Sequence, residues 1–359
     1  MRQRKGGDQM YWQKSKWWWR LGIGLLLLGA YIGLYQLRLA QAAPTSGSGA
    51  TVTLTNVSYD STREFYQAYN QNFQKYWQRK SGEKVAVAIS NGGSGKQANT
   101  VIEGNQADVV TLALAPDITS IQQAGLLKAN WQQRYPDNAA PYTSTVVFLV
   151  RKGNPQQIRD WPDLLKPAVN IVTPNPKTSG GARWNYLAAW AYASKKYHST
   201  EKARQFVRKL YQNVTVLDSG SRDATTTFAE NGQGNVLLTW ENEAKLVCQQ
   251  HPGEYEIITP SISIKAEPSV AVVDSVVAQR NTATVAQAYI QHLYSVKAQK
   301  IAAQNFYRPT NQKVAQAYRK EFPALQLVTI NDPLFGGWAK VQKQHFASGG
   351  IFDQIYGGG

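Results

Sequence analysis

The sequence predicts an α/β protein built as two lobes with mainly parallel sheets. The chain has 359 residues, which is too long for one small domain and suits two lobes of ordinary size. From residue 50 onward, short apolar runs alternate with longer segments of helical periodicity. The chain contains 11 Trp and 19 Tyr, so a large core can be filled. Together these observations favour alternating strands and helices over an all-helical or all-β chain.

The expected elements follow this alternation along the chain. Strands are predicted where apolar residues run together, and helices where they recur every three or four residues. The predicted helix at 60–82 carries six aromatic residues near helical spacing, which we expect to lie in the core. The expected strands are 51–59, 84–90, 107–115, 143–155, 168–176, 214–220, 235–240 and 269–277, and the expected helices are 60–82, 95–105, 181–197, 199–213 and 282–295.

Residues 1–42 have the composition of a secretory signal peptide. This segment holds seven Lys or Arg residues, one Asp, and an uncharged run of 15 residues at 21–35; Ala40 and Ala42 then offer a cleavage site. The run is short for a membrane-spanning helix, which needs about 20 apolar residues. We therefore expect cleavage and export to the periplasm, with retention as a membrane anchor as the alternative. Residues 43–50 would form a flexible mature N-terminus.

Charge and cysteine content narrow the function classes. The net charge is +16, but beyond residue 42 the basic residues are scattered singly or in pairs, so a nucleic-acid partner is not expected. The one cysteine, Cys248, excludes an internal disulfide and a cysteine-based zinc site. No two of the four histidines have the spacing H-x-x-x-H, and neither a metal nor another cofactor is expected.

The glycine-rich loop at 90–97 raises two catalytic alternatives. It reads SNGGSGKQ, so Ser90 replaces the opening glycine of a P-loop and Gln97 replaces its magnesium-binding hydroxyl. In the nucleophile elbow G-x-S-x-G, Lys96 takes the place of the last glycine. Both templates fail at positions that carry chemistry. An exported serine hydrolase or phosphatase acting through Ser94 or Ser179 stays the enzymatic alternative.

Two glutamates offer another enzymatic interpretation. Glu241 and Glu243 lie two residues apart, and on a strand they would share one face, as a glycosidase pair could. Such a pair would need a sugar cleft with aromatic walls. We do not expect this function.

Four junctions between predicted strands and helices are rich in Gly and Ser. They are VSYDSTRE, SNGGSGKQ, NPKTSGGARW and LDSGSRDATTTF, and each opens a helical or helix-like segment. The first turn of a helix presents unpaired N–H groups and a partial positive charge. Because ligands of α/β sheets bind beyond the carboxyl ends of strands, four such junctions predict an anion site that does not require Lys or Arg.

The same segments resemble a known family. NVSYDSTREFY, NGGSGKQA, NPKTSGGAR, VLDSGSR and WENEA are similar to segments of the periplasmic sulfate-binding proteins of sulfate/thiosulfate ABC importers. The resemblance runs from Leu54 to Tyr356, and NPKTSGGAR is a specific signature of that family. It implies a type II periplasmic solute-binding protein with two lobes and the ligand in the cleft between them. Two permease subunits and an ATPase would be the partners of a monomer.

The resemblance also implies which groups hold the ligand. In the family, sulfate is bound dehydrated by neutral donors, and thiosulfate is a second candidate here. The family often has alanine where Ser221 stands, so this chain would add a hydroxyl to the pocket. The donors implied are the main-chain N–H groups of Asp60, Ser94, Gly180, Gly181 and Ser221, the hydroxyl of Ser179 and the indole N–H of Trp240.

Three neighbouring side chains have other expected roles. The carboxylate of Asp60 should cap or brace its loop rather than touch the ligand. Lys96 is expected to be a solvated residue of a first helical turn, although it could offset the charge of the ligand. Arg183 should brace the loop through a salt bridge, with a position across the mouth of the cleft as the alternative.

Elementary chemistry gives these donors a selectivity. Glycines let the main chain approach an anion closely, and an indole N–H can only donate. A site of donors should reject hydrogen phosphate, whose O–H would find no acceptor. Molybdate, tungstate or phosphate in the same fold is the alternative ligand. We assign residues 51–142 and 272–359 to lobe I and 143–271 to lobe II, with crossing strands near 143–150 and 270–277.

Overall fold

A computed structural model describes residues 51–357, so the predicted signal segment 1–42 and the expected flexible N-terminus 43–50 lie outside the described residues. The first sheet has the strand order β10-β3-β1-β2. Strand β1 is parallel to β2 and β3, whereas β10 is antiparallel to β3. The strands are β1 (Val52–Tyr59), β2 (Val85–Gly92), β3 (Val109–Leu112) and β10 (Ser269–Val272).

The second sheet is larger and has the order β12-β9-β4-β7-β5-β6, with β8 and β11 also paired to β4. Strand β5 is parallel to β6 and β7, but β4 is antiparallel to each of its partners. The expectation of mainly parallel sheets therefore holds for most strand pairs away from β4, with β10 as the exception, and fails around β4. The strands are β4 (Tyr142–Arg151), β5 (Ile171–Pro174), β6 (Val214–Asp218), β7 (Val236–Trp240), β8 (Tyr255–Ile258), β9 (Ser263–Ala266), β11 (Arg308–Pro309) and β12 (Leu327–Val328).

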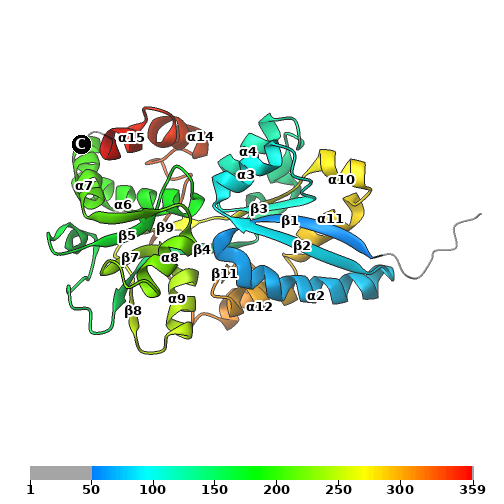
Figure 1. The fold of residues 1–359 in the computed structure, drawn as a ribbon, viewed down its shortest axis with the longest axis horizontal. Helices are drawn as coiled ribbons and strands as arrows, with labels where there is room; N and C mark the ends of the chain where they lie inside the picture. The colour runs from blue at the N-terminus through cyan, green and yellow to red at the C-terminus, as the bar shows by residue number, and fades with distance from the viewer. Residues whose placement is uncertain (1–50, 358–359) are drawn as a thin grey trace, which may run out of the picture. The chain divides into compact units, whose positions relative to one another are not determined.

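Helices surround both sheets. Figure 1 shows α2 along β2, and α6, α8 and α9 around the second sheet. Within the described residues, no helix is long and apolar enough to cross a membrane. The helices and short helical turns are η1 (Asp60–Thr62), α2 (Arg63–Ser81), α3 (Ser94–Ile102), α4 (Ala115–Gln123), η2 (Trp131–Arg134), α5 (Pro136–Ala139), η3 (Trp161–Leu165), α6 (Gly180–Tyr197), α7 (Thr200–Gln212), α8 (Ser221–Ala229), α9 (Glu241–Gln250), α10 (Asp274–Arg280), α11 (Ala283–His292), α12 (Val296–Gln304), α13 (Gln312–Ala317), α14 (Trp338–Val341), η4 (Gln342–Phe346) and α15 (Ile351–Tyr356).

Helix α2 illustrates how local sequence specifies an element. Five of its six aromatic residues are buried, which confirms the prediction that they belong to the core. The helix ends where Gly82 adopts a left-handed conformation with φ of 76°, a geometry that glycine reaches without steric cost. Two basic residues in the last turn complement the negative end of the helix dipole. Packing, capping and charge thus agree on the same boundaries.

One expected strand, and the strand geometry considered for a pair of glutamates, differ from the structure. The run predicted as a strand at 269–277 leaves the sheet after Val272, and α10 begins at Asp274. The helix dipole favours an acidic residue at the start of a helix, so Asp274 favours a helix here although the apolar run also fits a strand. Likewise, Glu241 and Glu243 lie in the first turn of α9 and not on a strand, so the geometry assumed for a glycosidase pair is wrong.

The division into lobes follows the two sheets over most of the chain. The first sheet takes its strands from 52–112 and 269–272, and β4 to β9 of the second lie between 142 and 266. The end of the chain differs from the assignment of 272–359 to lobe I, because β11 and β12 pair with the second sheet and α15 packs on α7. The lobe boundaries themselves stay a prediction.

Candidate anion-binding site

Each of the four Gly/Ser-rich junctions opens a helix or helical turn. Chain segments leaving β1 and β2 start η1 and α3, while segments following β5 and β6 start α6 and α8. The residues that precede these helical segments are Tyr59, Gly93, Ser179 and Gly220, and none of them caps its helix with a side-chain hydrogen bond. The first N–H groups of the four segments are therefore left to other acceptors.

The five predicted main-chain donors have N–H groups that are left without an acceptor in this way. Within residues 51–357, none of their N–H groups has a hydrogen-bond acceptor. All five residues are buried, so bulk water does not replace the missing acceptors. Buried N–H groups without a partner are rare in native proteins, and several together indicate an external acceptor. These residues are Asp60, Ser94, Gly180, Gly181 and Ser221.

The two consecutive glycines show how closely the helix starts approach one another. A Cβ placed on Gly180 would lie 2.7 Å from the Cβ of Ala113 and 3.0 Å from that of Ser94. A Cβ on Gly181 would overlap the Tyr59 hydroxyl and lie 2.7 Å from Ser221 Oγ. Both distances are too short for a side chain, so only glycine fits at the start of α6. The N-terminal turns of α3, α6 and α8 therefore meet around the end of β1.

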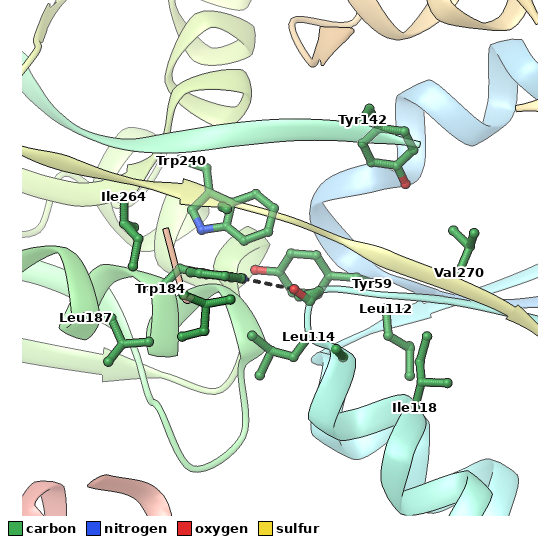
Figure 2. Packing of buried hydrophobic residues seen from close by; sticks show 14 of the residues in the cluster. Tyr59, Leu112, Leu114, Ile118, Tyr142, Trp184, Leu187, Trp240, Ile264 and Val270 are labelled. Carbon is green, nitrogen blue, oxygen red and sulfur yellow. Dashed lines mark hydrogen bonds between the residues drawn. The ribbon is translucent and has the colours of Figure 1, made fainter. Parts of the chain in front are cut away.

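Two predicted side-chain donors lie in the same place. Ser179 Oγ is buried and has no hydrogen-bond partner among the described residues. Trp240 packs its indole against the Tyr59 ring with centroids 5.5 Å apart, and Figure 2 shows the two rings beside each other. The indole N–H of Trp240 donates to the Gly181 carbonyl oxygen at a long 3.3 Å. It is thus only weakly engaged within the protein, whereas the sequence predicted a free donor.

Asp60 holds the junctions together. Its Oδ1 accepts a hydrogen bond from the Ser61 N–H at 2.8 Å, and its Oδ2 accepts one from the Arg222 N–H at 3.2 Å. Burial raises the pKa of this carboxyl to about 6, and the two main-chain hydrogen bonds oppose the increase. The side chain therefore joins η1 to α8, while its own N–H stays without an acceptor among the described residues.

Behind the glycine loop, a buried carboxylate fixes Ser94. The Ser94 hydroxyl donates to Asp117 Oδ2 at 2.5 Å and accepts from the Ala113 N–H at 3.1 Å. Burial raises the pKa of Asp117, whereas the charge of Arg183 lowers it. The guanidinium of Arg183 lies 3.9 Å from Asp117 and donates to the Pro176 carbonyl oxygen at 2.8 Å. Arg183 thus touches the bracing carboxylate and the loop before α6.

A comparison with known proteins places the chain in a family. The family model for bacterial extracellular solute-binding proteins matches residues 54–308. The chain belongs to this family. It is 56% identical over 315 residues to a protein named Sulfate-binding protein from Salmonella typhimurium, covering 87% of this chain and 95% of that protein.

Two further comparisons agree with this assignment. A protein named Thiosulfate-binding protein from Pseudomonas aeruginosa is 46% identical, covering 90% of this chain and 98% of that one. A solved structure described as the sulfate-binding protein SubI from Mycobacterium tuberculosis H37Rv has a TM-score of 0.74 and 33% identity, covering 82% of this chain and 99% of that one. The predicted two-lobed α/β fold and the resemblance drawn from the junctions are confirmed.

Sequence reasoning missed one charged cluster of this extracellular solute-binding protein. Arg222 pairs with Glu64 through two contacts of 2.9 and 2.8 Å, and its Nε lies 2.9 Å from Glu243 Oε1. Burial raises the pKa of Glu243 to about 7, and the charge of Arg222 opposes this. Glu64 and Glu243 are far apart in sequence and on different helices, so no local pattern could have revealed the cluster.

The open cleft of this solute-binding protein lies beside the buried donors. It has a volume of about 1200 Å³, and its lining includes Asp60, Lys96, Arg183 and Arg222. Lys96 is exposed in the first turn of α3, as expected for a solvated residue. Among residues 51–357, no cluster of three or more His, Cys, Asp or Glu side chains could hold a metal ion.

Proposed function

We propose that this protein is the extracytoplasmic solute-binding component of an ABC importer, and that it binds sulfate as a dehydrated dianion. The names of its relatives support the ligand, because the chain covers nearly the whole of a protein named for sulfate and of one named for thiosulfate. In such an importer, the binding protein would deliver the anion to membrane permease subunits, and an ATPase would power the transport. Thiosulfate is the second ligand that we propose.

The observation that carries the proposal is the convergence of buried N–H groups without acceptors. Five main-chain donors and the Ser179 hydroxyl, all without an acceptor among the described residues, lie where four helical segments start. An anion at this point would receive hydrogen bonds from peptide groups whose dipoles also favour negative charge. The ligand would need no direct contact with Lys or Arg, since the nearest guanidinium groups are already engaged by carboxylates.

Selectivity would follow from the protons of the ligand. Sulfate carries none at neutral pH, so each of its oxygens can accept from an N–H group. Hydrogen phosphate brings an O–H that needs an acceptor, and leaving it unpaired costs about 1–3 kcal/mol. The proposed site should therefore prefer sulfate over phosphate by about 5- to 150-fold, since 1.4 kcal/mol corresponds to a factor of ten.

Calorimetric titration of the purified protein tests this function. We expect sulfate to bind with a dissociation constant near micromolar, which is about −8 kcal/mol, and thiosulfate to compete with it. Phosphate should bind about 5- to 150-fold more weakly than sulfate. Binding of molybdate, tungstate or phosphate in place of sulfate would overturn the proposed ligand and leave the family assignment intact.

The proposed role also requires export to the periplasm. The N-terminal segment 1–42 lies outside the described residues, and its role as a cleaved signal stays part of the proposal. N-terminal sequencing of the protein recovered from the periplasm should begin at Ala43. A chain that keeps residues 1–42 and sediments with membranes would instead indicate an anchored form.

A hydrolase built on Ser94 has little support from the geometry. Its hydroxyl already donates to a carboxylate, and a serine nucleophile needs an imidazole base. The described histidines with side-chain hydrogen bonds lie elsewhere: His345 bonds Tyr186, and His292 bonds Asn72. We therefore propose binding without turnover.

A further inference from the structure

The Tyr59 hydroxyl is buried at the centre of the candidate site and has no role among the predicted donors. Tyr59 is the last residue of β1 and is fully buried. Its hydroxyl forms a hydrogen bond with Ser221 Oγ, which comes from the start of α8. A side chain at Gly181 would overlap this hydroxyl, so Tyr59 also reaches the start of α6. The phenol thus lies among donors from two separate helices.

The two hydroxyls together carry one proton more than the hydrogen bond between them uses. Tyr59 and Ser221 each carry one hydroxyl proton, and a single hydrogen bond joins them. Neither hydroxyl makes another hydrogen bond of ordinary geometry within the described residues, although the hydroxyls of Ser179 and Ser61 lie near enough to lower the pKa of Tyr59. One proton of the pair is therefore available to an external acceptor, and a buried hydroxyl without an acceptor is costly.

The chemistry of the two hydroxyls sets the direction of the internal hydrogen bond. A phenol is a stronger acid than an aliphatic alcohol, so Tyr59 is the better donor and Ser221 the better acceptor. Burial, with the Asp60 carboxylate nearby, raises the pKa of Tyr59, and the phenol keeps its proton at any physiological pH. With Tyr59 donating, the proton of Ser221 is the one left free.

We propose that Ser221 Oγ–H is a further donor to the bound oxyanion and that Tyr59 is a positioning residue that orients it. This inference rests on the proposed function. Ser221 already presents an unpaired main-chain N–H, and its Oγ lies 2.7 Å from where a Gly181 Cβ would be, beside two more such groups. The chain Tyr59 to Ser221 to anion is polarised in one direction, which strengthens each hydrogen bond.

The same orientation contributes to selectivity. While the phenol of Tyr59 donates to Ser221 Oγ, the serine hydroxyl turns its proton toward the ligand. Without the phenol, Ser221 Oγ is free to rotate and accept a proton from a ligand that carries one. Tyr59 therefore favours anions without protons over hydrogen phosphate, even though it does not itself touch the ligand.

A double-mutant cycle with Tyr59→Phe and Ser221→Ala tests the inference by sulfate calorimetry on the full chain. We expect Ser221→Ala to weaken sulfate binding about tenfold or more, as for loss of a hydrogen bond to a charged group. Tyr59→Phe keeps the ring on Trp240 and should weaken sulfate about fivefold, on the order of a neutral hydrogen bond. In the Ser221→Ala background, Tyr59→Phe should have no further effect, and alone it should lower the sulfate-to-phosphate preference.

Tyr66→Phe is the matched control, because it removes another fully buried phenol, bonded to Tyr142 at 2.9 Å in the core. It should leave sulfate affinity unchanged, and thermal unfolding without ligand should confirm that each variant is folded. Unchanged sulfate affinity in Ser221→Ala, or additive effects of the two substitutions, would overturn the inference. The proposed function would still stand in that case, provided that the unmodified protein binds sulfate. No sulfate binding by the unmodified protein would overturn both.

Discussion

Replacing Gly181 with alanine should damage ligand binding through steric overlap alone. The added methyl would overlap the Tyr59 hydroxyl and lie 2.7 Å from Ser221 Oγ. Neither atom can move far, since both residues are buried and bonded to each other. Overpacking of a close-packed interior costs about 1–3 kcal/mol. Because Tyr59 belongs to the first sheet and Gly181 to α6 beside the second, relief of the overlap would separate the donors from each other.

The expected result is a loss of sulfate affinity of about 5- to 150-fold, which corresponds to those 1–3 kcal/mol. Calorimetry measures this loss, and chemical denaturation measures the accompanying change in the free energy of unfolding. Gly95→Ala is the matched control: this glycine also lies in a first helical turn of the site, but a Cβ there would have only ordinary contacts, 3.6 Å from the Thr178 carbonyl oxygen and 4.0 Å from Asp117. Equal sulfate affinities for Gly181→Ala and the unmodified protein would refute the steric reasoning.

Three further predictions concern charge and bracing. The pKa of Asp60 is raised to about 6, so the native state holds the proton of this carboxyl more tightly than the unfolded chain does. The protonated carboxyl should therefore stabilise the protein below about pH 4, and this stabilisation should be lost as the pH rises to about 6. Asp60→Asn should flatten this part of the pH dependence of the free energy of unfolding, measured by denaturation at a series of pH values. Arg222→Met should lower the free energy of unfolding by about 3–5 kcal/mol because it leaves Glu243 buried without a partner, whereas Glu64→Gln, at a partly exposed carboxylate, should cost about 1 kcal/mol or less by urea denaturation. Equal costs for these two variants would contradict the assignment. Ser94→Ala should weaken sulfate binding by calorimetry, by about 1–3 kcal/mol, because the buried aspartate behind the loop loses its hydrogen bond; an unchanged affinity would show that this bracing is dispensable.

Local patterns explain which parts of the fold could be predicted from the sequence. The aromatic spacing of α2 and the glycine at its end are local, and the structure confirms that element. The four junctions were also visible, because Gly and Ser before a helical pattern mark a helix start wherever the rest of the chain lies. The run after Val272 was misjudged, since an apolar stretch fits a strand or a helix equally well and Asp274 decided the matter.

Contacts between distant residues explain what the sequence could not reveal about the candidate site. Asp117 has no motif around it, and its relevance comes from the hydroxyl of Ser94 and the guanidinium of Arg183. The bond between Tyr59 and Ser221 joins residues 162 positions apart. Such pairs depend on how β1, α6 and α8 are placed by the two sheets, which no single segment encodes.

The reliance on peptide N–H groups has a consequence for alanine scanning of this protein. At Asp60, Ser94 and Ser221, alanine keeps the main-chain donor, so a scan would report only the side-chain part of each contribution. At Gly180 and Gly181, alanine removes no interaction but fills the space that the anion's donors need. A scan would therefore show losses even at residues that have no side chain to lose, and an unaffected alanine variant elsewhere in the cluster would not exclude its main-chain N–H from the site.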